Sequence, residues 1–408
     1  MKYFSVSQNK GLMEIKRYFY SLRWVLAVPE ILLIIPCFVI SYLSRYSNRR
    51  IDVGLGPEPL ISNVYHKKAL IQHGYSAETF VSDVYFITNE FDINLSKWHS
   101  NLLTAAIIPF YLFLRCLFTY KSLFIYFHGG PLWTTTILDR FEPYFYKTAK
   151  IRVVVMPYGS DVQVLTRSKN LYFKHTVSKD YPNFRKYRRR VSNSVDRWTR
   201  YADWVISGCE WVDYMYHWDT LMLAHFSIDL ERWTPLKQEP EIDNSKKLRI
   251  LHAPNHVAIK GTKALVDAVE ALKKEGLDLE LILLRGVPNA EIQKAIQGVD
   301  VIADQFVIGW YAMFAMEAMA MKKPVLCYLR DDLIDLYTKA GLVRRQEIPL
   351  INTNLLEIAE KIRWAYSHRE ELIKIGERSR EFVRNHHSTE RIGEVFTNIL
   401  TSLGLRPS

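Results

Sequence analysis

The fold is decided by a stretch in the second half of the chain, DQFVIGWYAMFAMEAMAMKKPVLCY (residues 304–328). A loop that starts at Gly309 leads into an apolar segment, Tyr311–Met321, and Pro324 introduces a short apolar strand. This order predicts a loop, a buried helix and a buried strand. Glu317 is the only acid in the predicted helix, and a buried carboxylate needs a partner. The partner is either structural or a ligand hydroxyl, and the helix alone leaves both alternatives open.

The size and composition of the chain favour a globular protein of two domains. Its 408 residues exceed one ordinary core, and 49% apolar and 24% charged residues are close to average globular usage. The formal net charge of +11 and the pI near 9.2 favour an anionic partner such as lipid, nucleotide or nucleic acid. The four cysteines lie far apart, without the spacing of metal or redox sites, which indicates free thiols in a reducing compartment.

Alternating strands and helices are predicted from residue 51 onward. A strand and a glycine-rich turn span Ile51–Pro57, and a helix follows over Leu60–His73. The turn contains Gly54 and Gly56. Glycines between a strand and a helix let a ligand approach the backbone closely.

Two later strands are followed by polar residues. Strand Leu123–Phe127 ends at His128-Gly129-Gly130, and strand Arg152–Met156 ends shortly before Asp161. Open α/β sheets bind ligands at the carboxyl ends of their strands. The triplet and Asp161 are therefore candidate ligand-site residues, although a single His or Asp at such a place is more often a structural cap.

The second half of the chain shows the same alternation. Strands are predicted at Leu248–His252, Leu279–Leu284 and Val299–Ala303, and helices at Thr262–Glu275 and Asn289–Gln297. A polar, aperiodic segment before them predicts an interdomain linker. The expected organisation is an N-terminal segment, a first Rossmann-like domain, a linker, a second Rossmann-like domain and a C-terminal helix, at residues 1–50, 51–237, 238–247, 248–385 and 386–408.

An apolar run precedes the first predicted domain. Trp24–Leu43 is about as long as a bilayer-spanning helix, but Pro29, Glu30 and Pro36 interrupt it. It lacks the small-residue cleavage site of a signal peptide. Basic residues flank both ends, whereas a single span normally has them on one side. A re-entrant or in-plane membrane segment with both flanks cytoplasmic is as well supported as a span, and a helix buried on the globular body is the remaining alternative.

Two further segments suit a membrane surface. Residues 102–120 are an apolar stretch rich in aromatic side chains, and residues 184–190 form a basic cluster with aromatic residues between the cations. Core packing is the alternative for the first segment, and nucleic-acid binding for the second. Because no recognised nucleic-acid motif accompanies the cluster, we expect no nucleic-acid partner. The expected partner is an anionic membrane surface, contacted by residues 24–43, 102–120 and 184–190.

Two consecutive α/β sheets are expected to face each other across a cleft at the carboxyl ends of their strands. On the second domain, Lys260, Arg285, the loop Gly309–Ala312 and Glu317 are placed to line this cleft. A lysine near a helix N-terminus makes an anion site, and a carboxylate further on accepts the two hydroxyls of a ribose. Together these residue types indicate a nucleotide diphosphate, and in a two-domain cleft a nucleotide-sugar.

At these residues the sequence resembles a known family, the retaining glycosyltransferases of the GT-B fold, most closely the large family numbered four. The turn Ile259-Lys260-Gly261-Thr262 and the run from Glu317 to Val325 look like the Lys-Gly turn and the Glu-Ala-Met-Ala helix of that family. The resemblance implies an α/β GT-B fold of two Rossmann-like domains. It also implies that Lys260 binds the donor phosphates and that Glu317 holds the ribose.

The resemblance extends less specifically to the first half of the chain. His128 looks like the family's active-site histidine near the sugar, and Gly54 and Gly56 match its first glycine-rich loop. By the same resemblance, the last helix crosses back onto the first domain and stabilises a hinge whose closure brings His128 toward Lys260.

Two positions depart from the family pattern. The glutamate expected eight residues before Glu317 is replaced by Gly309, and the arginine expected before Lys260 is replaced by Asn255 and His256. An imidazole supplies a positive charge only when it is protonated. The aromatic residues that follow Gly309, Trp310 and Tyr311, are candidates to stack on the sugar instead.

The resemblance implies a hexosyltransferase-like enzyme that moves a sugar from a nucleotide-sugar to an acceptor with retention of anomeric configuration. His128, Lys260 and Glu317 are the expected catalytic residues, with the leaving diphosphate stabilised by positive charge. We expect no metal or other cofactor, because no Asp-x-Asp follows a strand. The apolar first half favours a lipid-linked or cell-surface glycan as acceptor, at the cytoplasmic face of a membrane. The alternative is a catalytically silent, membrane-attached nucleotide-binding scaffold.

Overall fold

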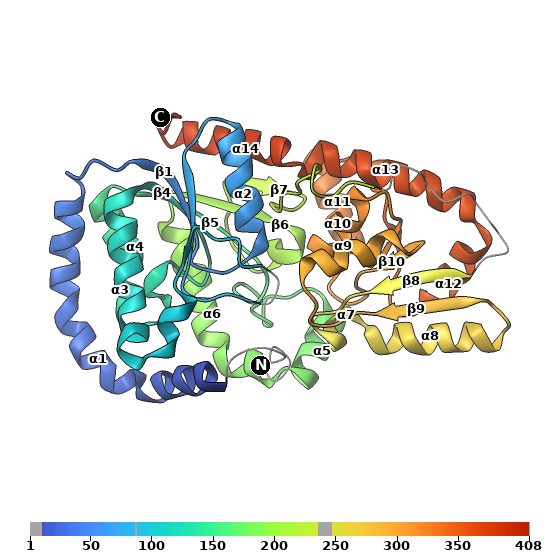
Figure 1. Cartoon of the computed structure of the whole chain (residues 1–408), viewed down its shortest axis with the longest axis horizontal. Coiled ribbons are helices and arrows are strands. Elements are labelled where there is room, and N and C mark those ends of the chain that lie inside the picture. The colour runs from blue at the N-terminus through green and yellow to red at the C-terminus, as the bar shows by residue number, and fades with distance from the viewer. Residues whose placement is uncertain (1–9, 86–87, 236–246, 408) are drawn as a thin grey trace.

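The computed structural model describes residues 10–85, 88–235 and 247–407, with side chains from Ala27 onward except at residue 102. It contains two parallel sheets, one in each half of the chain, both flanked by helices (Figure 1). Most of the expected linker, residues 238–246, lies outside the described residues.

The first sheet has seven parallel strands in the order β3-β2-β1-β4-β5-β6-β7. The chain leaves β1 toward one edge and returns at β4 to build the other, so the carboxyl ends of β1 and β4 form a topological switch point. The strands are β1 (Ile51–Leu55), β2 (Ala77–Val81), β3 (Ile93–Asn94), β4 (Tyr120–Tyr126), β5 (Arg152–Met156), β6 (Trp204–Gly208) and β7 (Thr220–Met222).

Successive residues of β4 point to opposite faces of this sheet, as the strand period of two requires. Leu123 and Ile125 belong to one buried cluster, which includes residues of the helices α3 (Leu102–Thr119), α4 (Glu142–Ala149) and α6 (Pro182–Tyr201). Phe124 and Tyr126 belong to a second cluster, with residues of α2 (Ile61–Gln72) and α14 (Thr389–Ser402). Both faces are therefore covered, which explains why this strand is apolar at nearly every position.

The second sheet has five parallel strands in the order β12-β11-β10-β8-β9. Its switch point lies between β8 and β10. The strands are β8 (Leu248–His252), β9 (Leu279–Leu283), β10 (Val301–Ala303), β11 (Val325–Cys327) and β12 (Ile351–Asn352). The helices are α7 (Val257–Lys260), α8 (Thr262–Lys274), α9 (Asn289–Gln297), α10 (Met313–Ala320), α11 (Asp331–Lys339), α12 (Ile358–Ser367) and α13 (Arg369–His387).

The C-terminal helix α14 leaves the second domain and packs on α2 of the first (Figure 1). Gly393 makes this approach possible, because a Cβ there would lie only 2.7 Å from the carbonyl oxygen of Ala69. Phe396 then makes edge-on ring contacts with His66 and Phe124, each with centroids 5.1 Å apart.

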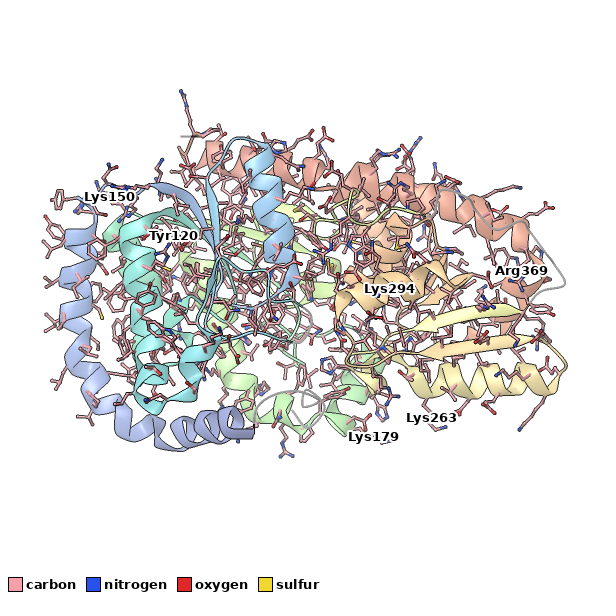
Figure 2. The ribbon with its side chains drawn as sticks, viewed as in Figure 1. Tyr120, Lys150, Lys179, Lys263, Lys294 and Arg369 are labelled. Carbon is pink, nitrogen blue, oxygen red and sulfur yellow. The ribbon has the colours of Figure 1, made fainter. Side chains whose placement is uncertain are left out.

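The basic cluster at residues 184–190, whose local structure the sequence analysis left open, lies in the helix α6. This helix follows α5 (Leu171–Asp180). Asn170 begins α5 as its N-cap, with its side-chain oxygen accepting from the N–H of Phe173 at 3.0 Å. Figure 2 shows Lys179, at the end of α5, on the lower edge of the molecule. Arg185, Arg188 and Arg189 of α6 are exposed.

The predicted apolar run is part of one long helix, α1 (Lys10–Ser44), which lies beside α4 at the outer edge of the first domain (Figure 1). The helix bends along its length, and Pro29 and Pro36 lie inside it. Glu30 is buried, and its carboxylate accepts hydrogen bonds from the backbone N–H groups of Thr136 and Ile137 at 2.9 and 2.6 Å. The acid that interrupts the apolar run is therefore a structural anchor.

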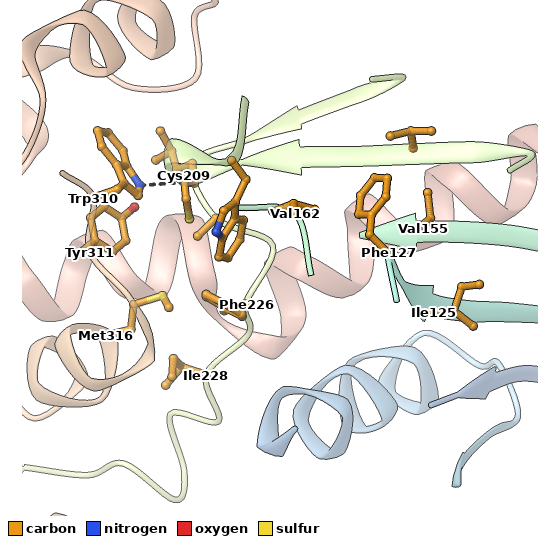
Figure 3. Packing of buried hydrophobic residues seen from close by; sticks show 14 of the residues in the cluster. Ile125, Phe127, Val155, Val162, Cys209, Phe226, Ile228, Trp310, Tyr311 and Met316 are labelled. Carbon is orange, nitrogen blue, oxygen red and sulfur yellow. Dashed lines mark hydrogen bonds between the residues drawn. The ribbon is translucent and has the colours of Figure 1, made fainter. Parts of the chain in front are cut away.

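The two domains share one continuous buried cluster. Trp310 and Tyr311 of the second domain pack near Cys209 and Phe226 of the first (Figure 3). Trp310 donates from Nε1 to the carbonyl oxygen of Leu223 at 2.8 Å, the hydrogen bond drawn in Figure 3. An apolar, hydrogen-bonded contact of this kind fixes the arrangement of the two sheets.

The four cysteines are free and buried, as the sequence predicted.

Candidate active site

The predicted site residues of the first domain gather at the switch point of its sheet. Gly54 and Gly56 lie at the end of β1, His128 directly after β4, and Asp161 after β5. A Cβ at Gly54 would lie 2.5 Å from the ring of Tyr120, and one at Gly56 would collide with the carbonyl oxygen of Phe80. Close packing therefore accounts for both glycines without a ligand.

His128 is half-buried and held on one side of its ring. Its Nδ1 lies 2.9 Å from the Tyr158 hydroxyl and 3.7 Å from Oε2 of Glu58. Trp133 stacks on the ring, with centroids 5.2 Å apart and planes 9° from parallel. Burial opposes the charged imidazole, but Glu58 and then Asp161 outweigh it and raise the pKa of His128, with Arg190 acting in the opposite direction. The structure thus places a partly exposed imidazole with a raised pKa at the switch point.

Asp161 is a structural cap. It is fully buried, and it accepts from the backbone N–H groups of Tyr158, Gly159 and Phe127 at 3.0, 2.9 and 3.1 Å. These bonds tie the loop after β5 to the end of β4. Burial raises the pKa of this carboxyl to about 6.

Gly129 and Gly130 rest on a second buried acid, Glu142 of α4. Its carboxylate accepts from the N–H groups of Gly130 and Leu132 at 2.9 and 3.0 Å and from the Tyr146 hydroxyl at 2.9 Å. A Cβ at Gly130 would lie 2.6 Å from this carboxylate, and Gly129 has a φ of +113°. The two glycines therefore shape the loop that presents His128.

In the second domain, Lys260 lies at the switch point between β8 and β10. It ends the short helix α7, and its Nζ lies 2.5 Å from Oδ1 of Asp304, a buried acid directly after β10. Thirteen per cent of the lysine side chain is exposed. The pair holds the ammonium group at the point where ligands of such sheets bind.

His256 and Arg285 lie on the same edge of the second sheet. Burial and then the charge of Lys260 lower the pKa of His256 to about 4, so the imidazole is neutral at physiological pH. His256 therefore does not replace the charge of the missing arginine. Its ring contacts that of Tyr181, with centroids 5.6 Å apart. Arg285 is exposed beyond the end of β9 and remains a candidate to bind phosphate.

Glu317 lies in α10 and is almost completely buried, with 4% exposure. The amide of Asn289, the first residue of α9, donates to Oε1 at 2.9 Å. Burial raises the pKa of Glu317 to about 8, against the hydrogen bond from Asn289 and the charge of Arg232. Glu317 thus has a structural partner, and its helix follows β10, the strand next to the β8 strand that precedes Lys260.

Trp310 and Tyr311 do not present their rings to a ligand, contrary to the expectation that they stack on a sugar. Each is 1% exposed. The Tyr311 hydroxyl lies 2.8 Å from Nε2 of His387, and Trp310 bonds to Leu223 as described. Both side chains belong to the buried cluster that the two domains share. Ala312, which caps α10, is only partly buried.

Gly309 occupies the position where the family has a glutamate. It has a φ of +97°, and a Cβ there would lie 2.7 Å from both Cγ and Cδ of Arg330. Arg330 is itself fixed by a buried ion pair with Asp213 of the first domain, 2.7 Å from Nη1, and by Asp332, 2.6 Å from Nη2. An interdomain ion pair thus fills the space beside Gly309.

The predicted residues form separate groups. Within residues 27–85, 88–235 and 247–407, no hydrogen bond, ion pair or ring contact joins His128 to Lys260 or Glu317. The two domains do meet nearby, where Asn170 at the start of α5 donates to the carbonyl oxygens of Val307 and Ile308 in the loop after β10, at 2.7 and 2.9 Å.

Sequence reasoning missed several polar residues that hold the predicted ones. They lie shortly after a strand or at the start of a helix. A polar residue at such a position can be recognised in the sequence as a candidate site residue. The missed residues are Glu58, Glu142, Tyr158, Asn289 and Asp304. In the part of the chain that the structure describes, no group of three or more His, Cys, Asp or Glu is arranged to hold a metal ion.

No protein-family model matches the chain, and no curated protein matches it significantly in sequence. Solved structures do match its fold. HepE from Anabaena in complex with UDP-glucose has a TM-score of 0.52 at 12% identity, covering 86% of this chain and 100% of its own. Sucrose-phosphate synthase from Thermosynechococcus elongatus has a TM-score of 0.55 at 13% identity, covering 87% and 99%.

A third similar structure is an α-glucosyltransferase in complex with UDP and a 13-mer DNA, with a TM-score of 0.50 at 12% identity, covering 87% of this chain and 100% of its own. At such identities the likeness is one of fold. It confirms the two-domain GT-B fold that the sequence predicted.

Proposed function

We propose that this chain is a glycosyltransferase that moves a sugar from a nucleotide-sugar to an acceptor with retention of anomeric configuration. The observation that carries the proposal is the placement of Lys260 and Glu317. They follow the neighbouring strands β8 and β10 and flank the switch point of the second sheet. A cation there suits a diphosphate, and a carboxyl group there suits a ribose diol. The fold is also that of structures solved with UDP or UDP-glucose.

The first experiment removes these two groups. Glu317→Gln and Lys260→Ala should each abolish transfer, measured with a panel of nucleotide-sugars and candidate acceptors. Because Lys260→Ala leaves Asp304 buried without its cation, the double variant Lys260→Ala/Asp304→Asn is tested beside it. Lys263→Ala is the matched control, because Lys263 is 85% exposed on the next helix. Wild-type turnover in folded Lys260 and Glu317 variants contradicts the assignment. Donor binding without turnover in the native protein favours the catalytically silent scaffold.

We propose further that the protein acts at the cytoplasmic face of a membrane. Within the described chain, one segment, Ala27–Ser44 of α1, is long and apolar enough to cross a bilayer, with a mean hydropathy of 2.0. Core helices and signal sequences share this property. One face of α1 packs on the first domain through Ala27, Glu30 and Cys37, while Leu32 and Ile35 are 73% and 74% exposed. A helix anchored along the body in this way supports in-plane attachment rather than a span.

The neighbouring helix α3 and the basic helix α6 support the same attachment. Leu103 and Ile107 of α3 are 74% and 53% exposed. Arg188 and Arg189 of α6 are exposed, and no ion pair of theirs is present among the described residues. Exposed cations without an ion-pair partner suit an anionic surface. A glycan carried on a lipid is the acceptor that this placement favours.

Vesicle flotation tests the attachment. Leu32→Gln/Ile35→Gln should lose binding to all vesicles, whereas Ile71→Gln, which alters an exposed apolar residue of α2, should not. Arg188→Gln/Arg189→Gln should weaken binding to anionic vesicles by about 2 kcal/mol, roughly thirtyfold. Lys273→Gln/Lys274→Gln on α8 removes the same charge elsewhere and serves as control. Equal binding by all four variants contradicts the proposal, and a salt-dependent shift with DNA but not with vesicles revives nucleic acid as partner.

A further inference from the structure

Glu58 lies at the same switch point as His128, three residues after the end of β1. The residue is 6% exposed. Its backbone carbonyl accepts from the side-chain amide of Asn63 at 2.8 Å and from the N–H of Leu60 at 2.9 Å. Its Oε1 accepts from the Tyr85 hydroxyl at 3.0 Å. These bonds fix both the backbone and the carboxylate, so that Oε2 is directed to the ring of His128.

The two nitrogens of His128 have different surroundings. Nδ1 faces the protein, with the Tyr158 hydroxyl at 2.9 Å and Glu58 Oε2 at 3.7 Å. Nε2 has no hydrogen-bond partner among the described residues, and the side chain is 26% exposed. A carboxylate beside one ring nitrogen favours a proton on that nitrogen and fixes the orientation of the ring. The free nitrogen then faces outward.

The charged groups around His128 come from three elements. Glu58 follows β1, Asp161 follows β5, and Arg190 belongs to α6. Burial works against the imidazolium, and Arg190 adds to this effect, but the two carboxylates together prevail. With both nitrogens protonated, Nε2 becomes a hydrogen-bond donor, and on deprotonation this donor is lost.

We propose that Glu58 is a positioning residue: it holds the His128 ring with Nδ1 toward the protein, so that Nε2–H donates to an oxygen atom of the transferred sugar. The inference rests on the proposed transferase function. The polar surroundings of His128 thereby have a role in the reaction. Tyr158 and Trp133 also support the ring, through the contact at Nδ1 and through stacking.

NMR titration of the His128 ring in the full-length protein tests the positioning without any substrate. The His128→Gln spectrum identifies the resonance among the twelve histidines. Glu58→Gln keeps the shape of the side chain and should lower the midpoint of the His128 titration by about one pH unit, a tenfold change in proton affinity. Tyr85→Phe is the matched control, because it removes the hydrogen bond to Oε1 and leaves the Glu58 side chain in place.

The pH profile of turnover tests the role in catalysis. In the native protein, kcat should fall as pH rises through the His128 midpoint, and in Glu58→Gln this fall should begin about one unit lower, with a small change in KM. An unchanged midpoint in folded Glu58→Gln overturns the inference, even if the protein is an active transferase. A shifted midpoint in a protein that transfers no sugar confirms the Glu58–His128 coupling, and it overturns the role toward sugar together with the proposed function.

Discussion

The surroundings of His128 and the loop Gly309–Ala312 occupy equivalent places, each after a strand at the carboxyl edge of its sheet, but they use their aromatic residues differently. In the first region, Trp133 supports an imidazole that stays partly exposed. In the second, Trp310 and Tyr311 are buried and hold the two domains together. The comparison teaches that an aromatic residue at the edge of an α/β sheet serves either a ligand or a neighbouring domain, and that only its exposed fraction distinguishes the two.

The largest expected effect is on stability in the second region. Trp310→Ala should lower the free energy of unfolding by about 3–5 kcal/mol, because it leaves a cavity in the domain contact and removes the hydrogen bond from Nε1 to Leu223. Chemical denaturation measures this, and Trp98→Ala, at a 38% exposed tryptophan, should cost far less. Trp310→Phe should retain the fold and the donor affinity. Loss of donor affinity in that variant shows instead that Trp310 serves a ligand, and the comparison fails.

A smaller effect is expected when the family's glutamate is restored. Gly309→Glu should lower stability by about 2 kcal/mol, because a side chain there has a positive φ and collides with Arg330. Turnover should not rise. The pair Gly309→Ala and Gly341→Ala separates the two causes, since Gly341 has a φ of +73° but nothing within 4 Å of a Cβ. If the two alanine variants lose the same free energy of unfolding, crowding by Arg330 does not contribute, and this part of the prediction is wrong.

The smallest expected effect is on the pH dependence of stability, and it concerns His387, whose pKa shifts in the opposite direction to that of His128. Burial, then the charge of His386, lowers the pKa of His387 to about 3, whereas that of His128 is raised. The unfolded chain takes up a proton near pH 6.5 and the folded chain does not, so stability falls as pH decreases from about 6.5 toward 3. Between pH 7.5 and 5.5, His387→Gln should lose about 1.4 kcal/mol less than the native protein. His368→Gln, on the surface, is the control, and parallel pH curves for all three proteins refute the prediction.

Much of the fold was predictable, because hydrophobic period and turn residues act locally. The strands Arg152–Met156 and Leu248–His252 and the helix Asn289–Gln297 have the predicted bounds. The start of α10 differs from the predicted start at Tyr311. The loop continues to Ala312, and Trp310 in this loop contacts the first domain. The two helices around the basic cluster were not predicted, although apolar residues recur there at helical spacing, because the high charge of the segment dominated its interpretation.

The candidate site was predictable only in part. The positions of His128 and Lys260 after their strands follow from the order of strands and loops in the chain. Their partners Glu58 and Asp304 follow other strands of the same sheet. No local sequence pattern predicts which acid lies beside which cation. The inward orientation of Trp310 and Tyr311 depends on the domain contact, which involves residues almost a hundred positions away along the chain.

Glu30 has a practical consequence for work with this protein. Its carboxylate lies within an apolar run and binds the backbone at residues 136–138, next to the loop that begins with His128. Removing the first fifty residues to gain solubility would take away this acceptor and uncover the face of α4 that α1 protects. Variants made for purification should therefore retain α1, since Glu30 ties this helix to the backbone at residues 136–138.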